Sequence, residues 1–471
     1  MASTWVWRGS YDRLEKVEAN REKKHLSGER NGQPLHAESW TEVKPGDAVL
    51  AWTQNRSIDA NRFKGAWVLN LKGHHASSLP YAEKERIWRR AGLSGGSPLD
   101  SERLFRVCII HLEPVELQRI DASGKAMQGK PLLQGNAGAW PDDPALRRVV
   151  RTAVAALYAL GLDIGEAEVG LGGDGRTAVR DAWPMLRDTR QEAAVLRRFA
   201  AWHAAAGAGA VDRQLLIGAD PEFVLVTPEG KIASASRFFG AGVGGAAGTD
   251  ALLVGRRLLY PVAELRPEPA EDPAALAANV RRLLLRAAER ISDPALRWAA
   301  GAMPVPGLAL GGHIHLSGAP LTSRLLRLLD SYAAFPLALV EDPAGRARRP
   351  RYGMLGDFRL QPHGGFEYRT LPSWLVSPAA AKAAFALALL CAREEHNLTY
   401  IPALDERYME AYYSGDRTEL AGCLDQAAGQ LGATTSYAAY ASYIEPLLDA
   451  ARRGMTWDES ADLRVKWRMP H

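Results

Sequence analysis

Between residues 215 and 374 the chain repeatedly places ionisable residues two positions apart within short, strand-like segments. Residues two apart on a β-strand point to the same face of a sheet. Leu310, Ile314 and Leu316 alternate with two histidines, which predicts a sheet with one apolar and one polar face. The polar pairs are Asp220 and Glu222, Glu264 and Arg266, His313 and His315, Asp357 and Arg359, and Glu367 and Arg369.

Any one of these segments also fits the solvated outer face of an ordinary antiparallel sheet. That interpretation suits the whole set less well, because a merely solvated face would mix in Lys, Thr, Ser and Gln. Here the positions hold almost only residue types that bind metals or phosphates. The neighbouring glycines Gly311, Gly312, Gly364 and Gly365 indicate that some group approaches the backbone closely.

Several carboxylates with one or two histidines favour a hard cation, Mg²⁺ or Mn²⁺, over a thiolate or all-histidine zinc site. The nearby arginines favour a polyphosphate, because a guanidinium binds phosphate oxygens through two parallel hydrogen bonds. Together these residue types predict phosphoryl-transfer chemistry. The chain has no Gly-x-x-x-x-Gly-Lys-Ser/Thr loop. A Gly-x-Gly-x-x-Gly pattern at residues 240–245 lacks a clear flanking strand and helix, which argues against a dinucleotide site.

Length and composition set the broad class. A chain of 471 residues predicts two or three folding units. The net charge of +4 is spread among interleaved acids and bases, so no nucleic-acid partner is expected. Three separated cysteines predict neither a disulfide scaffold nor a thiolate metal site and favour a reducing cytoplasm. The most apolar run, residues 383–392, is too short for a membrane span.

The pattern along the chain predicts four parts. Residues 1–132 are expected to form a β-rich accessory domain, a small barrel or curled sheet whose tryptophans belong to the core. Residues 133–212 are a linker and α/β lead-in, 213–400 the catalytic domain, and 401–471 a helical tail packed on it. Within the catalytic domain, Asp272 followed by Pro273 predicts the start of a helix that extends to about Ile291.

A family resemblance rests on several motifs that occur in order. They resemble the phage-type COOH-NH2 ligase (amidoligase) family, within the glutamine synthetase and glutamate–cysteine ligase superfamily. The resemblance covers about residues 150–395 and implies an α+β fold, a curved antiparallel sheet of glutamine synthetase type with helices on its back. The motifs are Gly218–Phe223, Gly248–Asp250, Glu264–Pro269, Gly311–His315, Arg349–Gly353, Gly356–Arg359 and Phe366–Arg369, with Tyr158–Asp163 ahead of them.

The resemblance also implies a set of metal ligands. The paired acids of the first strand would bind different ions, and two later acids would complete the shell of the first ion. A histidine and a glutamate would join one acid of the pair around the ion nearest the transferred phosphate. The first strand carries Asp-Pro-Glu instead of the two-glutamate pattern, so Glu222 matches the family better than Asp220 does. The ligand set is Asp220, Glu222, Asp250, Glu264, His313 and Glu367.

A second implied set holds the phosphates of ATP, the acyl phosphate or the substrate. It consists of Arg351, Arg359, Arg369, His315 and Arg266. The catalytic residues drawn from both sets are Glu222, Glu367, Arg359 and Arg369. The implied cofactors are ATP and two or three Mg²⁺ or Mn²⁺ ions.

The predicted reaction is ATP-dependent formation of an amide or peptide bond. A small-molecule or peptide carboxylate would attack the γ-phosphate of ATP, and an amine would attack the resulting acyl phosphate. Three alternatives stay open: a metal-dependent hydrolase built on His313 and His315, a degenerate nucleotide-binding module, and phosphorylation of a guanidino or amino group without ligation. The sequence selects neither substrate, leaves monomer and homo-oligomer open, and predicts no membrane partner.

Overall fold

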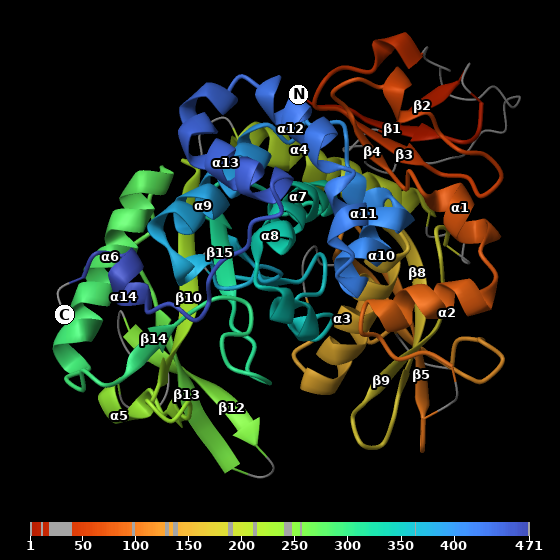
Figure 1. Ribbon diagram of the computed structural model, residues 1–471. Helices are drawn as coiled ribbons and strands as arrows, with labels where there is room; N and C mark the ends of the chain where they lie inside the picture. The colour runs from red at the N-terminus through yellow and green to blue at the C-terminus, as the bar shows by residue number, and fades with distance from the viewer. Residues whose placement is uncertain are drawn as a thin grey trace, which may run out of the picture. The chain divides into compact units, whose positions relative to one another are not determined.

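The structure is a computed structural model with a mixed α+β architecture (Figure 1). It divides into two compact units, Met1–Asp212 and Arg213–His471. The Gly-x-Gly-x-x-Gly pattern at 240–245 lies outside the residues that the structure describes. Those residues are 2–10, 13–17, 40–96, 99–127, 131–134, 140–186, 192–210, 214–239, 247–254, 257–362 and 364–469.

The first unit begins with a four-stranded sheet in the order β2 (Leu14–Val17), β1 (Thr4–Trp7), β3 (Ala48–Ala51) and β4 (Trp67–Leu69). The predicted barrel is wrong for this part of the chain. Strands β1, β3 and β4 pair in parallel, and the described strands form an open sheet. Their short apolar runs are buried on both faces, as is usual for parallel strands.

The tryptophans of this region divide into two groups. Trp5, Trp7, Trp52 and Trp67 are buried, which confirms their place in the core. Trp40 is 38% exposed and lies in the 3₁₀ turn η1 (Trp40–Glu42). The remaining short elements before the second sheet are η2 (Ala60–Arg62), α1 (Gly73–Ser78) and α2 (Tyr81–Arg90).

A second, five-stranded sheet of the first unit is antiparallel throughout. Helix α3 (Pro144–Ala159) packs on β8 and β9 of this sheet, and α4 (Glu192–Ala210) closes the unit. The sheet takes strands from both sides of residue 132. Its order is β7 (Leu133–Gln134), β6 (Glu113–Ile120), β5 (Arg103–Ile110), β8 (Ile164–Leu171) and β9 (Thr177–Trp183).

The second unit is built on an eight-stranded antiparallel sheet with the order β12-β13-β10-β15-β17-β16. Two further short strands, β11 and β14, pair with β10. Buried and partly exposed residues alternate along β15, as the sequence predicts. The strands are β10 (Leu216–Val226), β11 (Ile232–Ala233), β12 (Ala247–Val254), β13 (Arg257–Leu265), β14 (Arg297–Ala299), β15 (Gly312–Ser317), β16 (Phe358–Leu360) and β17 (Phe366–Tyr368).

Helices complete the second unit. Helix α9 (Pro378–Arg393) packs against α6, α7 and α13. Its apolar stretch is a buried core helix, and no helix of the described chain is long and apolar enough to cross a membrane. The other helices are α5 (Ser236–Phe239), α6 (Pro273–Arg290), α7 (Ser323–Leu329), the π-helix η4 (Asp330–Ala334), α8 (Phe335–Val340), α10 (Glu406–Ser414), α11 (Arg417–Ala421), α12 (Leu424–Gly432), α13 (Tyr437–Arg452) and α14 (Leu463–Lys466). Short 3₁₀ turns are η5 (Pro343–Arg348), η6 (Trp374–Val376) and η7 (Pro402–Leu404).

The start of α6 follows the predicted capping pattern. The Asp272 side chain accepts hydrogen bonds from the backbone N–H groups of Ala274 and Ala275, both at 2.9 Å, and Pro273 occupies the first helical position. Two otherwise unsatisfied donors of the first turn are therefore paired.

We expect Asp272→Ala to lower the free energy of unfolding by about 1 kcal/mol, because these two N–H groups lose their acceptor. Asp272→Asn keeps a side-chain oxygen at the same position and should cost much less. Urea unfolding of both variants, followed by circular dichroism, measures the difference. An equal loss in the two variants would show that the cap is not the stabilising interaction.

Candidate active site

The register between neighbouring strands collects the polar residues on one face of the sheet. Residues directly opposite each other in an antiparallel pair lie on the same face. Four cross-strand pairs connect β13, β10, β15, β17 and β16 in this way. The pairs are Glu222 with Glu264, Asp220 with His313, His315 with Glu367, and Arg359 with Glu367.

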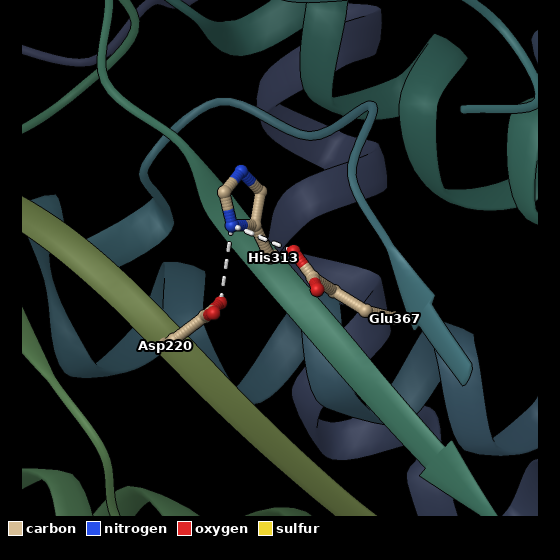
Figure 2. Close-up of side chains that lie close together, drawn as sticks. All are labelled: Asp220, His313 and Glu367. Carbon is tan, nitrogen blue, oxygen red and sulfur yellow. Dashed lines mark ion pairs between the residues drawn. The ribbon is translucent and has the colours of Figure 1, made fainter. Parts of the chain in front are cut away.

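Three of these side chains converge on one point. Figure 2 shows His313 of β15 between Asp220 of β10 and Glu367 of β17. The His313 Nδ1 atom lies 3.2 Å from a carboxylate oxygen of Asp220 and 3.3 Å from one of Glu367. One ligand atom from each residue lies within 4.8 Å of the other two. Two carboxylates and one imidazole at this spacing fit Mg²⁺ or Mn²⁺.

Charge within this cluster shifts two pKa values. Burial alone would raise the pKa of Asp220, but hydrogen bonds and charge from His313 and His315 hold it well below its usual range. Burial alone would lower the pKa of His313, yet the hydrogen bond to Asp220 and its charge raise it above the ordinary value. His315 also contributes directly, with Nε2 at 3.3 Å from Asp220 Oδ2. Asp220 is therefore an anion at neutral pH, the form that binds a cation.

Glu367 is almost fully buried, with 1% exposure, and both of its carboxylate oxygens have donors. Arg369 Nε lies 2.9 Å from Oε1. Arg359 Nη1 and Gln361 Nε2 lie 3.2 Å and 3.0 Å from Oε2. Gln361 was not among the predicted site residues, although it is the next residue after Arg359 on the same side of an extended segment. Asp357 also approaches this group, with Oδ2 at 3.7 Å from Arg369 Nη1.

A second group of acids lies across β10 and β13. Glu222 is buried, and its Oε2 accepts a hydrogen bond of 2.7 Å from the Gly311 N–H. Glu264 Oε1 pairs with Arg266 Nη2 at 2.7 Å. Asp250 lies in β12 opposite Val262, but its side chain is outside the described part of the chain.

In the part of the chain that the structure describes, Arg351 makes no hydrogen bond or ion pair with the other predicted phosphate-binding residues. It is exposed, and its guanidinium lies over the ring of Tyr352, 5.1 Å from the centroid. The structure thus gathers Arg359 and Arg369 around Glu367 without placing Arg351 in contact with them.

The glycines beside the histidines make room for groups of the protein itself. A Cβ atom on Gly311 would lie 2.4 Å from the His313 Nε2 atom. A Cβ atom on Gly312 would lie 2.4 Å from the Pro372 carbonyl oxygen and 2.7 Å from the indole of Trp374. The groups that closely approach Gly311 and Gly312 therefore belong to the protein itself. Gly364 has a φ of +90° and open space around it, so it serves the turn between β16 and β17.

We expect Gly311→Ala to weaken Mn²⁺ binding roughly tenfold or more, because the added methyl group must displace the His313 ring from Asp220 and Glu367. Electron paramagnetic resonance of free Mn²⁺ measures the affinity. Gly429→Ala in α12 is the matched control, since nothing lies within 4 Å of its added Cβ. Equal Mn²⁺ affinities for the two folded variants would rule out His313 as a ligand.

Comparison with known proteins adds a family match. The family model described as phage phiEco32-like COOH.NH2 ligase-type 2 matches residues 217–469. The match begins in β10, includes every residue of the cluster and continues through the C-terminal helices. No match was found among curated proteins.

Three similar solved structures have low sequence identity to this chain. A bifunctional glutathione synthetase from Pasteurella multocida is 12% identical with a TM-score of 0.35, covering 55% of this chain. The present chain spans about half of that protein, 53% of its length. The ATP-grasp ligase PsnB, complexed with minimal precursor, Mg and ADP, is 14% identical with a TM-score of 0.24 over 35% of this chain and 78% of its own. Apo GmaS is 16% identical with a TM-score of 0.30 over 59% of this chain and 78% of its own.

Proposed function

The chain belongs to the phage phiEco32-like COOH-NH2 ligase family and is a ligase enzyme, and we propose that it joins a carboxylate to an amine with ATP through an acyl phosphate. One observation carries this proposal. The buried carboxylate of Glu367 belongs to the trio of Asp220, His313 and Glu367 and also pairs with the guanidinium groups of Arg359 and Arg369. A site of this composition places positive charge where a phosphoryl group is transferred.

The trio is proposed to hold a divalent cation through Asp220, His313 and Glu367. When bound, the cation would neutralise negative charge on the phosphate oxygens. Glu222 and Glu264 are proposed as ligands of a further ion, with Asp250 completing that shell. The family pattern of two or three Mg²⁺ or Mn²⁺ ions is retained on this basis.

Arg359 and Arg369 are proposed to hold the transferred phosphoryl group. Their guanidinium groups already lie at the oxygens of Glu367, so a phosphate beside the trio is within their reach. Planar guanidinium groups suit this task, because each can donate two parallel hydrogen bonds to phosphate oxygens. His315, Arg266 and Arg351 are proposed to contact the nucleotide or the substrate.

In the proposed reaction an oxygen of the substrate carboxylate attacks the γ-phosphorus of ATP, and the bond to the β-phosphate oxygen breaks to release ADP. The amine nitrogen then attacks the acyl carbon, and inorganic phosphate leaves with the former carboxylate oxygen. The nitrogen loses a proton to give the neutral amide. ATP is required because amide formation from a free carboxylate and ammonium is uphill in water.

We also retain the finer predictions as parts of this proposal. They are a sheet curved in the manner of glutamine synthetase, a cytoplasmic location, and a small-molecule or peptide carboxylate as one substrate. The four-part division at residues 132, 212 and 400 and the accessory role of residues 1–132 likewise stay predictions.

The main alternative is a metal-dependent hydrolase that uses the same trio, with both His313 and His315 close to Asp220. That alternative does not account for the presence of Arg359 and Arg369 in the site. It also needs no nucleotide, which makes the two functions separable by one assay.

We expect the purified protein to form ADP when it receives ATP, Mg²⁺ or Mn²⁺, and pools of carboxylates and amines. The mass of the product should equal the mass of the acid plus the mass of the amine minus one water. Omission of either pool should reduce ADP formation to background. Hydrolysis of a substrate with metal alone, without ATP, would refute the ligase proposal.

Substitutions at the trio provide a second test. Glu367→Gln and His313→Ala should each lower kcat/KM by at least about a hundredfold, because each removes a proposed ligand of the cation next to the transferred phosphoryl group. Glu289→Gln on the exposed side of α6 makes the same charge change away from the site and should leave kcat/KM unchanged. Near-normal rates in both site variants would show that the metal assignment is wrong.

A further inference from the structure

The loop that leads into β16, residues Gly353–Asp357, is held at each of its residues by groups from other parts of the second unit. Hydroxyl groups from α10, a carboxylate from η4, and a hydroxyl and a backbone N–H from the two residues after β17 supply these contacts. The hydrogen bonds are Tyr412 Oη to Gly353 O (2.9 Å), Thr370 Oγ1 to Met354 O (2.8 Å), Leu355 N to Tyr413 Oη (3.0 Å), Gly356 N to Asp330 Oδ1 (3.0 Å) and Arg369 N to Asp357 O (2.9 Å).

Asp330 makes a second contact that links this loop to β17. The same Oδ1 atom accepts a hydrogen bond of 2.6 Å from the Tyr368 hydroxyl. Asp330 and Tyr368 have no measurable exposure. Burial and the neighbouring Asp330 keep the pKa of Tyr368 well above its ordinary value, so the hydroxyl stays a donor. Hydrogen bonds to a buried carboxylate are stronger than those between neutral groups.

The two segments joined by Asp330 carry the guanidinium groups at Glu367. Tyr368 lies between Glu367 and Arg369, and Gly356 lies three residues before Arg359. Strand β16 has only three residues, and two of them are exposed. So short a strand supports Arg359 weakly by itself, and the hydrogen bonds of the preceding loop add to that support.

We propose that Asp330 is a positioning residue for the phosphoryl group: its carboxylate fixes Tyr368 and Gly356 together and thereby sets the distance between Arg369 and Arg359. The inference rests on the proposed function, in which these two arginines bind phosphate. Tyr412 and Tyr413 of α10 support the other end of the same loop. Helix α10 therefore belongs to the phosphate-binding apparatus and is more than a tail packed on the catalytic domain.

Tyr368→Phe tests this inference, with Tyr332→Phe as the matched control. Both changes remove one hydroxyl from a buried tyrosine of the same unit. The Tyr332 hydroxyl donates to the Tyr400 carbonyl at 2.7 Å and makes no link between the loop and β17. We expect Tyr368→Phe to raise the KM for ATP roughly tenfold, as for the loss of one hydrogen bond to a charged group, with Mn²⁺ affinity unchanged. Tyr332→Phe should leave both quantities near the wild-type values.

Substitution of Asp330 gives an independent comparison. Asp330→Asn keeps an acceptor for Tyr368 and should raise the KM for ATP less than Asp330→Ala does. If Asp330→Ala does not fold, the pair of tyrosine variants still decides the question. Similar ATP KM values for Tyr368→Phe and Tyr332→Phe, in an active wild-type enzyme, would overturn the inference. A wild-type protein that neither binds nor consumes ATP would instead overturn the proposed function.

Discussion

The antiparallel register of β10, β15 and β17 is the constraint on which the site depends. It places Asp220 opposite His313 and, one strand further, His315 opposite Glu367. Because side chains alternate between the two faces, a slip of one residue would turn the ligands of that strand into the apolar side. The register is secured by the buried face, where Ile314 and Leu316 of β15 have no exposure. Burial of the apolar side chains on one face of the sheet therefore fixes the direction of the polar side chains on the other face.

A buried carboxylate such as Glu367 is stable only if its lost hydration is replaced. Arg359, Arg369 and Gln361 replace it in this structure through direct contacts with both oxygens. Two of these donors, Arg359 and Arg369, are also the groups proposed to bind phosphate, so stability and function share these interactions. Removal of one partner would leave a buried charge without compensation. Substitutions of these residues should therefore lower the stability of the protein as well as the reaction rate.

Residues that are distant in sequence hold the strands of the site in place. Arg348 is buried and donates to the carbonyl oxygens of Thr370 and Leu371, directly after Arg369. Burial lowers the pKa of Arg348, and Tyr412 and Glu341 offset part of that effect. Trp374 packs against Gly312 and donates to its carbonyl oxygen at 2.8 Å. These contacts hold the ends of β15 and β17 in place, and they lie within the span of the family match.

The sequence alone determined the parts of the site that depend on local alternation and on residue chemistry. Spacing by two predicted that His313 and His315 share the polar face of β15, and the Asp272–Pro273 pair predicted the start of α6. Local patterns do not specify which strands become neighbours, so the parallel pairing of β1 with β3 and the exposure of Trp40 were not foreseen. Only the tertiary structure placed Gln361 on Glu367 and Asp330 between Tyr368 and Gly356. The physical reason is that these contacts depend on the path of loops and on packing between distant segments, and neither leaves a periodic signal in the chain.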